Sequence, residues 1–161
     1  MIADVNFRTI VNKKTIIVTS AGALVGCAII LICWSSFRLY RVVKVGIPEA
    51  YAAWTTADLI IDHMQAHGGE WPTGWELLNQ AAVERLENGR ALRCEAGRLP
   101  ELVSVNWEFD PKVWIPTASL VTSFKLRVVT RRDGTEFRTV WHGAEPNEMI
   151  SDFLLTGKRK Q

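Results

Sequence analysis

The stretch TIIVTSAGALVGCAIILICW occupies residues 15–34 and decides how the rest of the chain is interpreted. It carries no charged residue, and 15 of its 20 positions are apolar. An α-helix rises about 1.5 Å per residue, so about 20 residues match the ~30 Å hydrocarbon layer of a bilayer. A helix is also the only single segment that satisfies its own backbone hydrogen bonds in lipid. The stretch therefore predicts one transmembrane helix, with Trp34 at the membrane interface.

This span divides the 161 residues into parts of different character. Outside it, 62 of the other 141 residues are apolar, which is typical of a soluble domain. We predict a short N-terminal tail over residues 1–14, the span over 15–34, a basic juxtamembrane segment over 35–47, a soluble domain over 48–157 and a basic tail over 158–161.

The net charge of +2 is unevenly distributed. Residues 1–47 carry six basic residues against one acidic residue, whereas residues 48–161 carry 13 against 16. The soluble domain is therefore mildly acidic, which argues against a nucleic-acid partner. Three basic side chains lie on each side of the span, and the N-terminal amine adds to the first side. We therefore expect a single-pass bacterial inner-membrane protein with its domain outside the cytoplasm.

The residues after Pro48 have helical periodicity. Apolar side chains recur at intervals of three and four residues, at Trp54, Ala57, Ile61 and Met64. This spacing places them on one face of a helix over residues 49–67. Proline is tolerated in a first helical turn, and the glycines at 68 and 69 are typical of a helix end.

A second helix is predicted after the tryptophan at position 71. Thr73 and Glu76 have the spacing of a capping box, in which each side chain satisfies an amide at the helix start. We expect this helix to continue to Glu87 and to end at Asn88-Gly89.

The second half of the chain shows the alternation that is typical of strands. Apolar and polar residues alternate over 103–109 and again over 124–128, and Asp133-Gly134 is a hairpin signal before a return strand over 136–141. Residues 113–116 indicate a short edge piece. Pro146 and Gly157 are placed to begin and end a final helix. The predicted fold class is α+β: a transmembrane helix, two helices, an antiparallel sheet of about three strands and a C-terminal helix.

The order of these elements resembles that of type IV pilin-like proteins, and most closely the pseudopilins of type II secretion. The resemblance covers residues 15–78. It includes the apolar N-terminal helix, its continuation, and the segment Gly69-Glu70-Trp71-Pro72-Thr73 followed by Leu77-Leu78. It implies an antiparallel sheet packed on the helix and a role in an envelope or secretion assembly. No prepilin cleavage motif is found around residues 12–18.

Two histidines of the first predicted helix are candidate metal ligands. His63 and His67 are four residues apart and share a face, as in zinc-binding helices, and His142 is a candidate third ligand. Met64 stands where zinc peptidases carry their catalytic glutamate. We favour the alternative that both histidines lie on a polar edge near the helix C-terminus, where positive charge is favourable. We therefore predict no metal and no cofactor.

Other candidates have equally plain structural explanations. Cys94 lies between Arg93 and Glu95, but no histidine is placed beside it by the sequence, so we expect a structural thiol. Glu145, Asn147 and Glu148 are able to ligate a cation, although acidic residues also suit a helix start.

The glycines of the span and the tryptophans of the chain also predict packing contacts. Gly22 and Gly26 form a G-x-x-x-G pattern inside the span, which predicts a helix–helix interface with a second copy. Most of the seven tryptophans fall on predicted core faces, and Trp114 is the one that we expect to be exposed.

We predict a membrane-anchored protein with a small non-catalytic domain for interaction or structure. Its expected partners are the lipid bilayer, a second copy through the span and an unidentified protein. No catalytic residue is assigned, because no phosphate-binding loop, nucleotide fingerprint or nucleophile elbow is present. Two alternatives stay open: a pilin-like envelope or secretion component, and a metal-dependent hydrolase that uses His63, His67 and His142.

Overall fold

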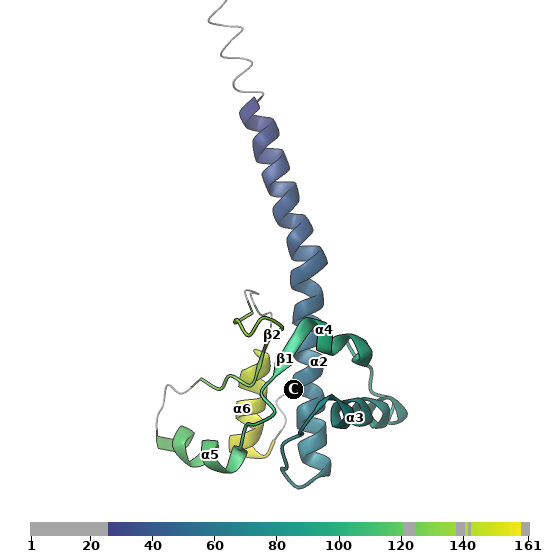
Figure 1. Cartoon of the computed structure of the whole chain (residues 1–161), viewed down its shortest axis with the longest axis vertical. Helices are drawn as coiled ribbons and strands as arrows, with labels where there is room; N and C mark the ends of the chain where they lie inside the picture. Colours follow the sequence, from purple (N-terminus) through teal and green to yellow (C-terminus); the bar gives the residue numbers. More distant parts are fainter. Residues whose placement is uncertain (1–25, 121–124, 138–140, 142, 159–161) are drawn as a thin grey trace, which may run out of the picture. The chain divides into compact units, whose positions relative to one another are not determined.

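A computed structural model of the chain describes residues 26–120, 125–137, 141 and 143–158 (Figure 1). The chain divides into two compact units, Met1–Val43 and Lys44–Gln161, and each is described by itself. The described part contains helices and a short antiparallel sheet, as the predicted α+β class requires, together with one long apolar helix near the N-terminus.

The long helix covers Gly26–Ala66 and is apolar enough in one stretch to cross a membrane. Residues 15–25 of the predicted span lie outside the described residues. The helical pattern changes to a π-helix over Val42–Gly46 before α2 begins at Ile47–Ala66. Pro48 has no amide hydrogen, and its ring crowds the carbonyl group four residues earlier. A π turn is one way for a helix to absorb that disturbance.

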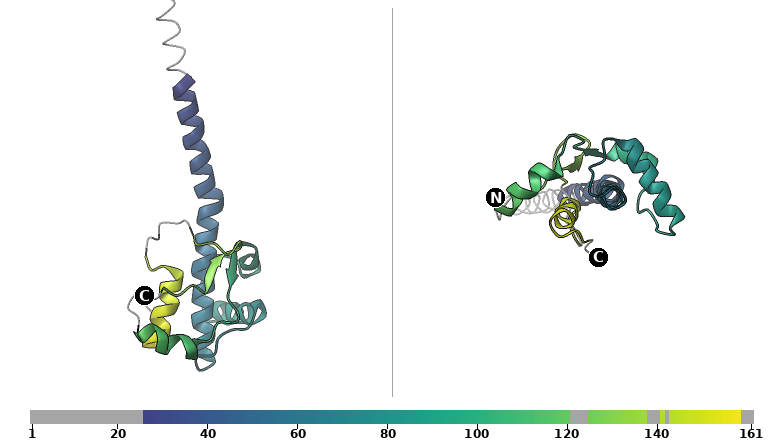
Figure 2. Two further views of the ribbon diagram at one scale, coloured as in Figure 1. Left: turned by 60° about the vertical axis from the view of Figure 1, so that its left-hand side comes forward. Right: turned by 90° about the horizontal axis from the view of Figure 1, so that it is seen from below.

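Helix α2 is the centre of the second unit. Helices α3 and α6 lie on different sides of it, and both strands also contact it (Figure 2). As a result, twelve of its residues are buried, far more than the one predicted face. The helix ends as predicted: Gly68 and Gly69 have φ angles of 65° and 91°, and the Gly69 amide donates to the Met64 carbonyl at 2.8 Å.

Helix α3 spans Trp75–Glu87, and the predicted capping box at its start is wrong. Gly74 is the N-cap residue, with no side-chain hydrogen bond to the helix. Thr73 therefore stands one residue too early to cap the helix. The other end is as predicted, because Asn88 is the C-cap and Gly89 has a φ of 71°.

The loop after α3 leads into a 3₁₀ turn at Ala96–Arg98 and the short helix α4 at Leu99–Leu102. The sheet then has two strands in its described part, not the predicted three. Strand β1, Val103–Val105, pairs antiparallel with β2, Val129–Arg131, so that Ser104 is opposite Thr130. Residues 113–116 belong to helix α5, Pro111–Leu120, and not to an edge strand.

The Asp-Gly hairpin turn forms, but no strand follows it among the described residues. Gly134 has a φ of 76°, and its amide donates to the Arg131 carbonyl at 2.9 Å. The Arg131 amide in turn donates to the Thr135 carbonyl at 3.0 Å. Residues 136, 137 and 141 are not in a strand, and residues 138–140 lie outside the description.

Asn147 takes the place of a strand at the outer edge of β2. Its Oδ1 accepts hydrogen bonds from the amides of Val128 and Val129, at 3.0 and 2.8 Å. Its Nδ2 donates to the Val129 carbonyl at 2.9 Å. The Val129 amide and carbonyl are the groups of β2 that a further strand would use, so the side chain takes the place of a strand at this position.

Helix α6 spans Pro146–Thr156 and carries Asn147 in its first turn. The Glu145 carboxylate caps the helix by accepting the Glu148 amide at 3.2 Å. Gly157 ends it in the left-handed conformation, with a φ of 66°, as the sequence predicts.

Replacement of Asn147 by Ala tests this account of the sheet edge. It leaves two buried amides and one carbonyl without the side chain that binds them, so we expect a loss of about 2–4 kcal/mol in unfolding free energy. Chemical denaturation of the full chain in detergent, followed by tryptophan fluorescence, measures the change. Asn79→Ala on the exposed face of α3 is the matched control, and an equal effect of both substitutions would contradict the assignment.

Candidate functional site

The exposed apolar surface of the first unit is the main candidate for a functional site. Ile29, Ile30, Leu31 and Ile32 expose between 56% and 67% of their surface, and Trp34 and Phe37 are similarly open. These are large side chains on all sides of one helix, with no described residue covering them. Burying such area from water is favourable by about 25 cal/mol per Å², so this helix is suited to lipid or to a protein partner.

The predicted helix–helix interface lies partly outside the description. Gly22 is not among the described residues. Gly26 is helical, and a Cβ atom built on it meets no described residue within 4 Å. The surface at Gly26 is therefore open to close approach by another helix.

The structure brings His63 and His67 together at the C-terminal end of α2. Their rings stack with centroids 4.1 Å apart, and the Nδ1 atom of His67 lies 2.9 Å from the His63 carbonyl oxygen. Among the described residues, no three His, Cys, Asp or Glu side chains are grouped to hold a metal ion. His142 lies outside the described residues.

Burial also affects the protonation of His63. His63 is 5% exposed. The pKa of His63 is lowered from its ordinary value, first by burial and then by the nearby charge of His67, while Glu84 and Glu70 act in the opposite direction. The fold therefore favours the neutral form of His63.

The other sequence candidates are occupied by structural contacts. Glu145 and Asn147 bind one another through Oε1 and Nδ2 at 2.9 Å, in addition to the helix cap and the sheet edge described above. The backbone amide of Cys94 donates to the Thr55 hydroxyl at 3.1 Å, which fixes the loop on α2. Burial raises the pKa of the Cys94 thiol, so the environment does not activate it.

The tryptophans mostly act as core anchors. The indole nitrogen of Trp54 donates to the Ala144 carbonyl at 2.9 Å, and that of Trp71 donates to the Asn106 carbonyl at 3.0 Å. Trp75 and Trp107 pack edge to face. Trp114 is 7% exposed, so the expectation of an exposed ring is wrong. It is buried because α5, not an edge strand, turns the ring toward Phe109.

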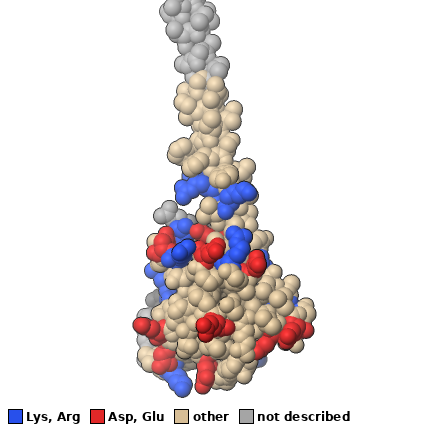
Figure 3. All heavy atoms as spheres, turned by 45° about the vertical axis from the view of Figure 1, so that its right-hand side comes forward, with Lys and Arg blue, Asp and Glu red and all other residues tan. Residues whose placement is uncertain are grey.

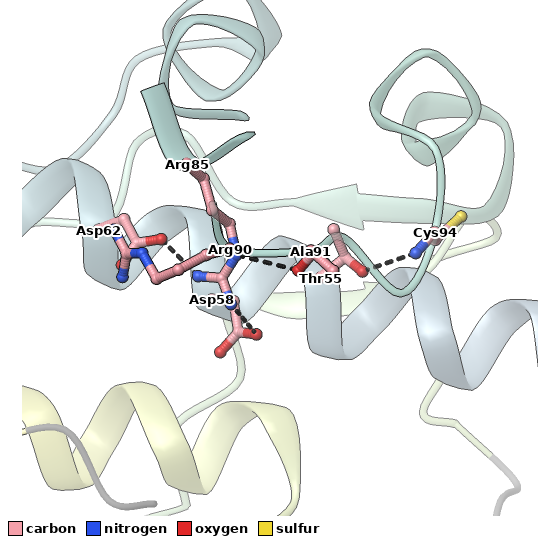
Figure 4. Close-up of polar contacts among 7 residues, drawn as sticks. All are labelled: Thr55, Asp58, Asp62, Arg85, Arg90, Ala91 and Cys94. Carbon is pink, nitrogen blue, oxygen red and sulfur yellow. Dashed lines mark hydrogen bonds and ion pairs between the residues drawn. The ribbon is translucent and has the colours of Figure 1, made fainter. Parts of the chain in front are cut away.

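A partly buried ion-pair network joins α3 to α2 (Figure 4). The Arg85 guanidinium binds Asp62 at 2.5 Å and Asp58 at 3.2 Å. Arg90, from the following loop, binds the other oxygen of Asp62 at 3.0 Å. The only signal in the sequence is the spacing of Asp58 and Asp62, which places two carboxylates on one helical face.

Comparison of the chain with protein-family models, curated proteins and solved structures finds no match. The functional argument therefore rests on the residues and contacts described above.

The lowered pKa of His63 predicts a pH dependence of stability. The unfolded chain binds a proton at this site more readily than the folded chain, so the unfolding free energy decreases as the pH falls below 6.5. His63→Gln removes this titration, and we expect a flatter profile just below that pH in denaturation of the full chain. His67→Gln keeps the burial of His63 and removes only the smaller effect of the His67 charge, so we expect a profile closer to that of the wild-type chain. A profile unchanged by His63→Gln would contradict the assignment.

Proposed function

We propose that this protein is a single-pass membrane anchor that holds a small, non-catalytic interaction or structural domain at the bilayer. One observation carries the proposal: the helix of the first unit exposes large apolar side chains on all sides. The apolar length and composition of Gly26–Ala66 support a span, and residues 15–25 extend the uncharged stretch further.

The domain's own chemistry supports a role in presenting a surface. Polar side chains such as Asp58, Arg85 and Asn147 form ion pairs with one another or hydrogen bonds with the backbone of neighbouring elements. We further propose that the domain lies outside the cytoplasm of a bacterial cell, on the charge distribution around the span. The partners proposed are the bilayer, a second copy through the span and a protein that binds the domain.

A second candidate is a pilin-like envelope or secretion component. The observation that favours it is the position of Trp71, in the segment that carries the resemblance. Trp71 is buried, and its indole holds the Asn106 carbonyl next to β1, while the sheet packs on α2. This is the helix-and-sheet arrangement that the resemblance implies.

Two arginines placed within the exposed helix test the anchor. Ile29→Arg/Ile32→Arg leaves an uncharged stretch over residues 15–28, which is shorter than the ~17 residues that a span needs. We expect the wild-type chain to stay with bacterial membranes after urea or carbonate extraction and this variant to be released. Fractionation followed by immunoblotting measures the distribution.

The matched control makes the same change on the other unit. Val83→Arg/Leu86→Arg places two arginines on α3, at apolar side chains that are about as exposed as Ile29. We expect this control to stay with the membrane. Release of the wild-type chain by urea would refute the anchor. In the same cells, labelling of Cys94 by a membrane-impermeant maleimide, with Cys94→Ser as the blank, reports the side of the membrane.

The intact mass of the protein recovered from membranes tests the second candidate. If the chain is processed as a prepilin, a leader is removed before the apolar stretch, and the mass decreases accordingly. Retention of Met1 would count against prepilin processing and would leave the anchor itself unaffected.

A further inference from the structure

Two arginines of the first unit lie in the same helix, a few residues after its uncharged apolar stretch. Arg38 and Arg41 are both exposed, and neither forms an ion pair with another described residue. In Figure 3, Lys and Arg side chains make a blue band on the helix, and the rest of its described surface in that view is mostly tan. These guanidinium groups are therefore free to bind a ligand outside the chain.

The Arg41 side chain extends toward the N-terminal end of the helix. Its guanidinium carbon lies 5.9 Å from the centre of the Phe37 ring, one helical turn toward the N-terminus. Side chains on a helix tilt in that direction, and the same tilt points Arg38 toward the turn of Trp34. Both charged groups thus reach back toward the predicted end of the span.

Three exposed aromatic rings lie in the same stretch of helix as the two arginines. Trp34, Phe37 and Tyr40 are each about 60% exposed. Tryptophan and tyrosine are enriched where the hydrocarbon layer meets the headgroups, because one part of the ring is apolar and another is polar. An acidic protein segment would leave these rings in water, so their presence favours a lipid surface as the partner.

We propose that Arg38 and Arg41 bind the phosphate groups of anionic phospholipids at the bilayer surface next to the span. A guanidinium group binds two phosphate oxygens at once, which a single ammonium group does not do in the same geometry. The contact would fix the depth of the helix in the bilayer. This inference rests on the proposed membrane anchor.

Reconstitution of the full chain into lipid nanodiscs tests the inference. The discs contain phosphatidylcholine alone or phosphatidylcholine mixed with phosphatidylglycerol, and native mass spectrometry counts the lipids that stay on the released protein. We expect phosphatidylglycerol to be retained by the wild-type chain. Arg38→Gln/Arg41→Gln should weaken that retention roughly thirtyfold, because each basic side chain near an anionic surface contributes about a factor of five.

Two further variants separate the geometry from simple charge. Arg38→Lys/Arg41→Lys keeps the charge and should give intermediate retention. Arg132→Gln, which removes an exposed arginine of the second unit, should match the wild-type chain. Equal retention of phosphatidylglycerol by the wild-type chain and Arg38→Gln/Arg41→Gln would overturn this inference alone. A wild-type chain that does not insert into the discs would overturn the anchor as well.

Discussion

The burial of α2 on several faces is the constraint on which the second unit depends. A helix with one apolar stripe needs one neighbour, but α2 is buried on most of its faces and needs several. The first half of α2 permits this because its buried residues are small, which lets neighbouring elements approach closely. These residues are Ala50, Ala52, Ala53, Thr55, Thr56 and Ala57. Helices α3 and α6 and both strands are arranged around this surface.

Covering α2 also buries polar groups, and ion pairs offset the cost of burying its charged side chains. Asp58 and Asp62 would be costly to bury alone, and Arg85 offsets that cost with a guanidinium placed between them. Glu49, in the first turn of α2, binds Arg131 through both carboxylate oxygens, at 2.8 and 3.1 Å. This second pair attaches the hairpin turn to the helix. The polar contacts thus specify which element covers which face.

The sequence predicts the helices of this unit better than its strands, for physical reasons. Gly68, Gly89 and Gly157 end their helices locally, through left-handed conformations that glycine adopts without strain. At the edge of β2, where the sequence predicts a further strand, the distant Asn147 of α6 binds the amide and the carbonyl of Val129 instead. The Arg85 network likewise joins residues 23 and 27 positions apart. Alternation and spacing do not reveal contacts of that kind.

The two ends of the long helix differ in which side chains are buried and which are exposed. This difference supports a protein environment around one end and a lipid environment around the other. In α2 the small residues lie inside, in contact with other elements. In the first unit the large residues Ile30, Leu31 and Ile32 lie outside, on every side of the helix. Small side chains stabilise a helix in a protein interior because they let neighbouring elements pack closely against it. Large apolar side chains stabilise a helix in lipid because they bury apolar area there without a protein neighbour. The described helix of the first unit carries large exposed side chains, as expected for a helix in lipid. A lipid environment accounts for these side chains without a further protein partner.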